Sequence, residues 1–260
     1  MIRADYHLHT AFSDGANTPE EMVKAALQKG MRRIGFSDHA HTPFDESYCM
    51  KPSDTDRYKQ TIAQLRKEYR GRIEVLCGIE QDLYSDTPTD GYDFVIGSVH
   101  YLRVDGEYLP VDESPAILAD GVRRRFDGDW YALCEAYYDA VGQVVEKTGA
   151  AVIGHFDLIT KFNEGGRLFD ECHPRYAAAY RRALERLLPG GAVFEINTGA
   201  ISRGWRTAAY PAPEILREIA LGGGKVIMSS DAHSAAAVGF GFETAAALAS
   251  SCGLTPVDAL

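Results

Sequence analysis

The sequence of 260 residues predicts one α/β domain built as a parallel β/α barrel. Seven short apolar segments alternate with helical patterns or long polar stretches, as is typical of parallel strands joined by crossover connections. Polar and ionisable residues follow six or seven of these strands, whereas in an open doubly wound sheet they flank a single crevice. A barrel is therefore favoured over an open sheet, and no linker, repeat or low-complexity segment divides residues 1–260.

The first half of the chain contains four predicted strands. Residues 2–8 alternate loosely between apolar and polar, as a short strand does. A helix begins after Thr18, because Pro19 suits its first position and Glu21 completes a capping box, and Gly30 ends it. The other elements predicted here are a strand at 33–37, a polar helix at 54–69, and buried strands at 73–79 and 94–99.

The second half contains three predicted strands and two long polar stretches. Residues 102–127 and 161–170 are broken by glycine, proline or charged residues, which predicts loops over the strand ends. Prolines at 174 and 213 open two helices. The regular elements predicted here are helices at 129–148, at 174–187, after 213 and up to about 251, and strands at 151–154, 192–196 and 225–228.

Histidines gather at the predicted carboxyl ends of strands, which a parallel barrel brings to one rim. Seven of the eight histidines lie there: His7, His9, His39, His41, His100, His155 and His233. Glu80 and Asp231 close two apolar strands, and Asp14 lies in the turn after the first strand. Buried carboxylates are costly unless they are paired or coordinated, and the available neighbours are these histidines.

This combination of side chains predicts a site for several metal ions. Imidazole with carboxylate suits Zn, Mn or Fe rather than Ca or Mg. Eight or nine ligands exceed the need of one ion, so two or three metals with a bridging carboxylate are expected. Clustered metals lower the pKa of bound water and hold the attacking and leaving oxygens of an in-line displacement at phosphorus. The pattern therefore predicts a hydrolase of phosphate esters.

The motifs around these residues resemble those of the polymerase-and-histidinol-phosphatase (PHP) family. They are D-Y-H-L-H-T, S-D-H, G-I-E, S-V-H, G-H-F-D and S-S-D-A-H, spread over nearly the whole chain. Further segments resemble its histidinol-phosphate phosphatase branch: S-V-H-Y-L, D-E-S-P, I-G-H-F-D-L-I-T-K-F-N and F-E-I-N-T-G-A-I-S-R-G. The resemblance implies a distorted seven-stranded (β/α) barrel of the TIM-like type. It also implies hydrolysis of L-histidinol phosphate to L-histidinol and phosphate in histidine biosynthesis.

The resemblance further implies three divalent metals and a metal-bound hydroxide as the nucleophile. The implied ligand sets are His7, His9, Glu80 and Asp231 for the first metal, Asp14, His39 and His233 for the second, and Glu80 (bridging), His100 and His155 for the third. Some relatives have histidine in place of Asp14. A carboxylate is a harder ligand and favours Mn or Fe over Zn, so the identity of the metal stays open among the three.

Other residues near these motifs have candidate roles. Asp38 and Asp157 adjoin predicted ligand histidines and are expected to orient an imidazole from outside the metal shell. Glu195 either supports that shell or forms a hydrogen bond within the core. His41 either protonates the leaving group, as a metal-bound water could also do, or is a solvated loop residue.

Two basic residues of the predicted rim loops are candidates for phosphate binding. Arg203 offers a planar fork that suits phosphate oxygens, and Lys161 offers a point charge. The alternative for both is a solvated surface position.

The composition narrows the partners and leaves two other functions open. A net charge of −10 predicts that the protein does not bind nucleic acid, and the lack of a long apolar run predicts that it does not span a membrane. Five scattered cysteines and the lack of a signal peptide predict a cytoplasmic protein with reduced thiols. The first alternative is another phosphoesterase or nuclease of the family, acting on nucleotides or DNA ends. The second is a non-enzymatic metal-binding domain.

Overall fold

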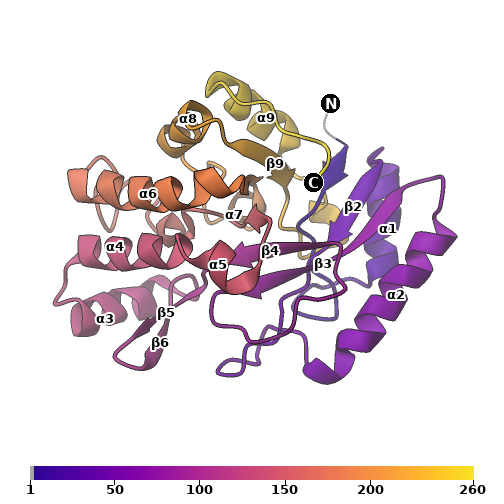
Figure 1. Ribbon diagram of the computed structural model, residues 1–260, viewed down its shortest axis with the longest axis horizontal. Helices are drawn as coiled ribbons and strands as arrows, with labels where there is room; N and C mark the ends of the chain where they lie inside the picture. The colour runs from indigo at the N-terminus through magenta and orange to yellow at the C-terminus, as the bar shows by residue number, and fades with distance from the viewer. Residues whose placement is uncertain (1–2) are drawn as a thin grey trace.

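The protein is built around a parallel sheet of seven strands that curls into a nearly closed barrel (Figure 1). A computed structural model describes residues 3–260. The strands follow one another around the barrel: β1 (Ala4–Asp5), β2 (Arg33–Phe36), β3 (Glu74–Asp82), β4 (Phe94–Ser98), β7 (Val152–Ile153), β8 (Val193–Asn197) and β9 (Lys225–Ser229). The predicted seven-stranded barrel is therefore confirmed. Residue 2, where the first strand was predicted to begin, lies outside the described residues.

Helices cover the outside of the barrel. They are α1 (Pro19–Gln28), α2 (Thr55–Glu68), α3 (Pro115–Arg125), α4 (Trp130–Val141), α5 (Val144–Thr148), α6 (Pro174–Leu187), α7 (Gly199–Ser202), α8 (Pro213–Leu221) and α9 (Phe242–Ser251). In Figure 1, α1 and α2 lie on one side of the sheet and α3, α4 and α6 on the other. The capping box of Thr18 and Glu21 is present at α1. Within residues 3–260, no helix has the length and apolar character needed to cross a bilayer.

The barrel closes where the segment after β1 meets the segment after β9. Leu8 and Ala232 form a parallel bridge. His9 N donates to Ala232 O at 2.9 Å, and Ala232 N donates to His7 O at 3.1 Å. Beside this bridge, the buried carboxylate of Asp5 accepts from Ser230 N at 3.0 Å. The two ends of the chain therefore bring their histidines and carboxylates to the same place.

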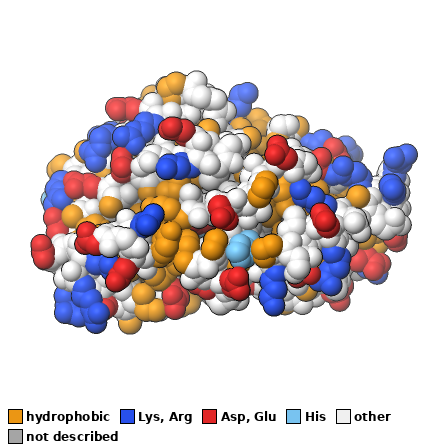
Figure 2. Space-filling view, turned by 60° about the horizontal axis from the view of Figure 1, so that its bottom comes forward, with side chains coloured by type: hydrophobic (Ala, Val, Ile, Leu, Met, Phe, Trp, Pro, Cys, Tyr) orange, Lys and Arg blue, Asp and Glu red, His pale blue; other side chains and the backbone are white. Residues whose placement is uncertain are grey.

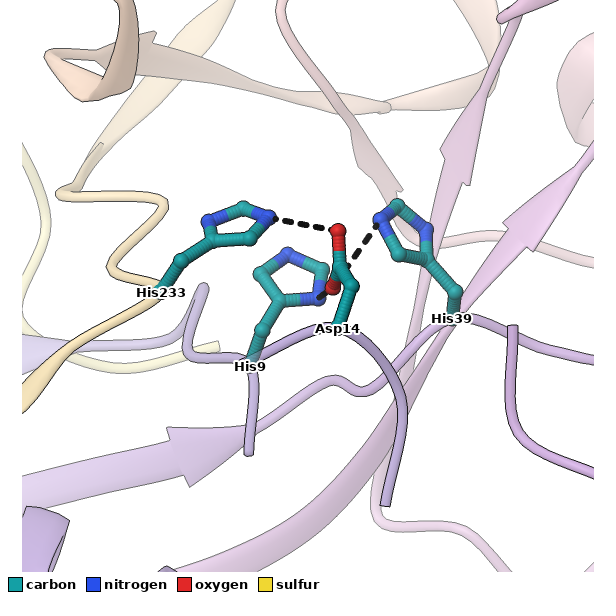
Figure 3. A group of neighbouring side chains, drawn as sticks. All are labelled: His9, Asp14, His39 and His233. Atoms are coloured by element: carbon teal, nitrogen blue, oxygen red, sulfur yellow. Dashed lines mark ion pairs between the residues drawn. The ribbon is translucent and has the colours of Figure 1, made fainter. Parts of the chain in front are cut away.

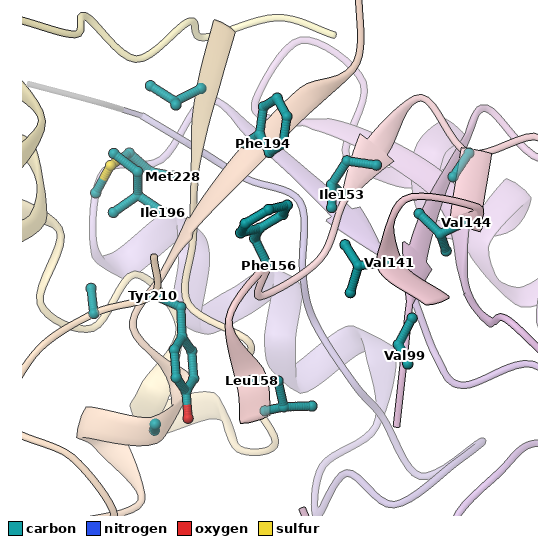
Figure 4. Close-up of a cluster of buried hydrophobic side chains, with 14 of the residues drawn as sticks. Val99, Val141, Val144, Ile153, Phe156, Leu158, Phe194, Ile196, Tyr210 and Met228 are labelled. Atoms are coloured by element: carbon teal, nitrogen blue, oxygen red, sulfur yellow. The ribbon is translucent and has the colours of Figure 1, made fainter. Parts of the chain in front are cut away.

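The apolar core has two parts. Outside the barrel wall, side chains of the strands and of the segments after them form the larger cluster, of which Figure 4 shows Phe156, Phe194 and Met228. Inside the barrel, a smaller cluster includes Tyr6, Phe94, Ile96, Val152 and Ile227. This inner cluster is a packed core and not a pore, as in other barrels of this type.

A glycine and the end of the chain complete the inner cluster. A Cβ on Gly78 would lie 2.3 Å from the ring of Phe94, so the ring requires glycine at this position of β3. Val257 packs against the inner cluster, and Tyr6 OH donates to Asp258 O at 2.8 Å.

The prediction of a loop over residues 102–127 is wrong. The segment forms the antiparallel hairpin β5 (Tyr101–Val104) and β6 (Glu107–Pro110), followed by α3. Asp105 and Gly106 both have positive φ, at 52° and 84°, as a two-residue hairpin turn requires. Ser114 caps α3 by accepting from Ile117 N. The Asp-Gly and Ser-Pro pairs are therefore turn and cap signals within this stretch.

The helix predicted over residues 129–148 is two helices. Gly142 and Gln143 separate α4 from α5. Glycine is among the weakest helix formers, which explains the break at this point. Asp129 caps α4 by accepting from Tyr131 N and Ala132 N, so the predicted start is confirmed.

Replacing Asp5 by alanine should lower the stability of the barrel. Asp5 is fully buried and accepts from Ser230 N, Ser230 Oγ and Gly239 N. Its loss leaves these donors unpaired, so we expect the free energy of unfolding to fall by about 3 kcal/mol. Denaturant unfolding of Asp5→Ala measures this, with the exposed Glu185→Ala as control. Equal midpoints for the two variants would show that the contact does not stabilise the closure.

Candidate metal centre

The structure brings all nine side chains predicted as metal ligands to one end of the barrel. Each comes from the carboxyl end of a strand or from the adjoining turn. His7 and His9 follow β1, Asp14 precedes α1, His39 follows β2, Glu80 lies in β3, His100 follows β4, His155 follows β7, and Asp231 and His233 follow β9.

The carboxylate of Glu80 lies at the centre of this cluster. Its Oε2 is 2.9 Å from His39 Nδ1 and 3.1 Å from His7 Nε2. Its Oε1 is 3.1 Å from His155 Nε2 and 3.5 Å from His100 Nε2. His9 Nε2 lies 3.5 Å from Oε2 as well, so one carboxylate faces five imidazoles from four different strand ends.

A second group surrounds Asp14 (Figure 3). The imidazoles of His9, His39 and His233 point toward its carboxylate from three segments far apart in the sequence. Asp14 Oδ2 is 3.2 Å from His233 Nε2, and Asp14 Oδ1 is 3.7 Å from His9 Nδ1 and 3.8 Å from His39 Nε2. The ring of His9 lies between the other two rings, with centroid distances of 4.3 and 4.2 Å.

Asp231 joins a third group with the two histidines that follow β1. Its Oδ1 is 3.3 Å from His9 Nε2 and 3.8 Å from His7 Nε2. Asp231 has a φ of 49°, in the left-handed region that non-glycine residues seldom occupy and that is often found at functional sites. Gly199 leaves room for this carboxylate, because a Cβ there would lie 2.6 Å from Asp231 Oδ2.

The residues fit divalent transition metals. Among residues 3–260, buried atoms of the cluster that form no hydrogen bond include His7 Nε2, both ring nitrogens of His9 and Glu80 Oε2. Such atoms cost free energy unless a partner satisfies them, and metal ions accept lone pairs from both groups.

Burial and neighbouring charges shift the pKa values of the cluster in different directions, lowering those of His9 and Glu80 and raising those of His7, His39 and His100. Burial lowers the pKa of His9 to about 3, so its imidazole is neutral. Burial by itself would raise the pKa of Glu80, but the charges of His7, His39 and His100 hold it well below its usual range. The carboxylate of Glu80 is therefore ionised.

A cleft with a volume of about 380 Å³ opens over the cluster. It is lined by Asp14, His39, Asp45, Ser47, Tyr48, Glu80, His100, Tyr101, Asp112, Glu113, His155, Leu158, Lys161, Arg203, Trp205, Asp231 and His233. The two predicted phosphate-binding cations are among them. Lys161 Nζ lies 3.1 Å from Asp112 Oδ2. The guanidinium of Arg203 forms an ion pair with Asp231, in which a terminal nitrogen lies 2.9 Å from Asp231 Oδ2.

Comparison with known proteins identifies the family. The PHP domain matches residues 5–199. The chain belongs to the PHP domain family. A probable histidinol-phosphatase of Deinococcus radiodurans is 34% identical to this PHP chain, over 93% of the chain and 90% of that protein. The histidinol-phosphatase of Bacillus subtilis is 29% identical, over 94% of the chain and 98% of that protein.

Two solved structures share the fold of this PHP chain. HisK of Listeria monocytogenes superposes with a TM-score of 0.81 at 20% identity, covering 93% of this chain and 99% of that one. The histidinol phosphate phosphatase of Lactococcus lactis, solved with zinc, L-histidinol and phosphate, has a TM-score of 0.67 at 22% identity. It covers 98% of this chain and 95% of that one.

Glu195 and His41 were predicted to lie near the metal ligands, and the structure places only Glu195 against them. Glu195 contacts the cluster, since its Oε1 is 2.7 Å from His7 Nδ1. This contact fixes the ring of His7, with Nε2 facing Glu80. His41 does not line the cleft of the PHP chain, and its Nε2 lies 3.0 Å from Glu46 Oε1. The geometry therefore does not support His41 as a proton donor.

Asp38 and Asp157 do not orient imidazoles, contrary to expectation. Asp38 accepts from Thr10 N at 2.7 Å and from Ser13 Oγ at 2.6 Å, so it holds the turn that carries Asp14. Asp157 accepts from Ala212 N at 2.9 Å. Asp38 directly precedes His39, and neighbouring residues of an extended segment point to different sides, which explains the first correction. Asp157 lies beyond the end of β7, at the start of the turn Leu158–Thr160, where the alternation of a strand no longer applies.

Asp82 contacts His100, which the sequence pattern did not predict. Its Oδ2 accepts from His100 N at 2.8 Å and lies 3.4 Å from His100 Nδ1. The signal was present, because residues two apart on a strand share a face and Asp82 follows Glu80 by two positions. The sequence pattern had predicted a strand over residues 73–79 that is closed by Glu80. In the structure, β3 extends two residues further, to Asp82.

Replacing Glu195 by glutamine should weaken metal binding without unfolding the PHP chain. The change keeps the shape of the side chain but removes the charge that fixes His7. We expect the affinity for a divalent transition metal to fall by about tenfold. Competition with a chromophoric chelator measures the affinity, with the exposed Glu243→Gln as the matched control. Equal affinities in the two variants would contradict the supporting role of Glu195.

Proposed function

We propose that this PHP chain is a metal-dependent phosphomonoesterase that converts L-histidinol phosphate to L-histidinol and phosphate, a step of histidine biosynthesis. The observation that carries the proposal is that Lys161 and Arg203 line the same cleft as the histidine and carboxylate cluster. A cleft with both kinds of group suits a small phosphate ester. The names of the relatives from Bacillus subtilis and Deinococcus radiodurans support the choice of substrate.

We assign three metal sites within the cluster. The groups of side chains that lie close together overlap with the sets implied by the motifs, but they also place His9 beside Asp14 and pair His100 and His155 with Glu80 in separate groups. The assigned sets are His7, His9, Glu80 and Asp231; Asp14, His39 and His233; and Glu80, His100 and His155. Bound Zn, Mn or Fe would supply a nucleophilic hydroxide at neutral pH and neutralise charge on phosphoryl oxygens. Glu80 lies within 3.5 Å of five imidazoles, so it would be the ligand that the sites share.

Side chains of the cleft bind and orient the phosphate. Arg203 keeps its position through Asp231 O, at 3.0 Å, and Asp231 Oδ2. Burial would lower the pKa of Arg203, but the charge of Asp231 raises it, so the guanidinium stays cationic. Lys161 Nζ, bonded to Asp112 O at 2.8 Å, presents a second cation to the same cleft. Charged groups fixed before the substrate arrives stabilise the phosphoryl oxygens most effectively.

A small substrate is also favoured over nucleic acid. On the face shown in Figure 2, basic and acidic side chains are scattered among one another and form no broad basic surface. Nucleic-acid binding depends on such a surface. We also place the enzyme in the cytoplasm, because all five cysteines are free thiols, as a reducing compartment favours.

Removal of metal should abolish hydrolysis. The protein loaded with Zn or Mn should release phosphate from L-histidinol phosphate, and a chelator should stop this until metal is restored. Phosphate release is measured colorimetrically, with single-stranded DNA as the parallel substrate. Intact DNA is expected. Degraded DNA would favour the nuclease alternative, and bound metal without turnover of any ester would favour a non-enzymatic domain.

Replacing Lys161 by methionine should weaken substrate binding. The change keeps the length of the side chain and removes one of the two cleft cations. We expect the KM for L-histidinol phosphate to rise about 10- to 100-fold, the range of a charged hydrogen bond. The exposed Lys147→Met of α5 is the matched control and should leave KM unchanged. An unchanged KM in Lys161→Met would place the phosphate elsewhere in the cleft.

A further inference from the structure

Trp205 differs from the other aromatic residues of the cleft. Its side chain is 46% exposed, whereas Tyr101 is 8% exposed. Tyr101 OH donates to Asp45 Oδ2 at 2.5 Å, and Tyr48 OH lies 3.0 Å from Thr42 Oγ1. The hydroxyl groups of both tyrosines therefore form hydrogen bonds within the wall of the cleft. A single exposed aromatic residue is ordinary on a protein surface, but this one lines the candidate active site.

The backbone on both sides of the indole is fixed. Trp205 N donates to Ala200 O at 2.9 Å and Gly204 N donates to Ile201 O at 3.0 Å. With Gly204 at a φ of 74°, these bonds form a Schellman motif at the end of α7. The next residue, Arg206, donates to Thr160 O at 3.0 Å.

The same segment connects the indole to both candidate phosphate-binding residues. Arg203 is the C-cap of α7, two positions before Trp205. Thr160, to which Arg206 is bonded, immediately precedes Lys161.

Among residues 3–260, the indole ring has one aromatic neighbour. The ring of Phe162 meets it edge to face, with centroids 5.3 Å apart and an interplanar angle of 80°. Lys161 Nζ lies 5.8 Å from the centroid of the indole. A large flat ring is thus held in place beside the two cations and still remains nearly half exposed. Fixed aromatic surfaces of this kind bind flat groups by stacking.

We propose that Trp205 is the surface on which the aromatic ring of the substrate stacks. The site would then select phosphate monoesters whose alcohol carries a flat aromatic ring close to the ester. This inference rests on the proposed function. In L-histidinol phosphate, three carbon atoms separate the ester oxygen from the imidazole. A phosphate held by Lys161 and Arg203 therefore leaves the imidazole within reach of the indole.

Inhibition by the two reaction products tests the proposal. L-Histidinol carries the ring and inorganic phosphate does not. In Trp205→Ala we expect the inhibition constant of L-histidinol to rise about tenfold, as loss of an aromatic stack does. The inhibition constant of phosphate should stay within about twofold, because phosphate binding does not involve the ring. Trp205→Phe retains an aromatic face and should restore most of the affinity for L-histidinol.

Fluorescence provides a second measurement that needs no turnover. The chain has two tryptophans, and Trp130 lies at the start of α4, where it packs against Phe169. Trp130→Phe leaves Trp205 as the sole emitter, and L-histidinol added to the metal-loaded protein should change its emission. The matched variant Trp205→Phe leaves only Trp130, whose emission should not respond.

The outcomes separate this inference from the proposed function. If the wild-type enzyme releases no phosphate from L-histidinol phosphate, the proposed function fails. If it does so but Trp205→Ala weakens L-histidinol and phosphate equally, or weakens neither, the stacking role is overturned. An unchanged emission of Trp205 on addition of L-histidinol would overturn it as well.

Discussion

The metal centre depends on the closure of the barrel by its first and last strands. Asp5 and Ser230 are 225 positions apart in the chain, yet they share a hydrogen bond of 3.0 Å. The bridge between Leu8 and Ala232 joins the same two segments a few residues further along. Without this closure, the histidines after β1 and the carboxylate after β9 would lie at opposite edges of an open sheet. Closure is therefore the condition under which their side chains can share a cation.

The same cluster is a costly arrangement in the absence of cations. Glu80 is buried and ionised, and several ring nitrogens near it form no hydrogen bond among the described residues. Asp231 is held in a left-handed conformation. Buried charge and backbone strain both reduce stability. Metal ions that bind the folded chain and not the unfolded one would offset these costs, so binding and stability are coupled.

A single short segment after β8 combines several tasks in the cleft. The four consecutive residues Arg203 to Arg206, with Trp205 among them, form the end of α7 and the turn after it. Arg203 contacts the carboxylate of Asp231, and Arg206 contacts the loop that carries Lys161. This arrangement joins the candidate phosphate-binding residues to the histidine and carboxylate cluster through an ion pair and hydrogen bonds, as a preorganised site requires.

The sequence by itself determined the barrel and the residues at its rim. Strand periodicity locates the end of each strand to within a few residues, and parallel strands carry their carboxyl ends to one side, so Glu80, His100 and His155 could be placed together from the sequence. Local patterns could not show which partner each rim side chain meets. Asp38 bonds to Thr10 instead of an imidazole, Asp82 meets His100, and His41 lies outside the cleft. The tertiary structure decided these pairings, because side-chain contacts depend on how strands and loops from distant parts of the chain are oriented in space.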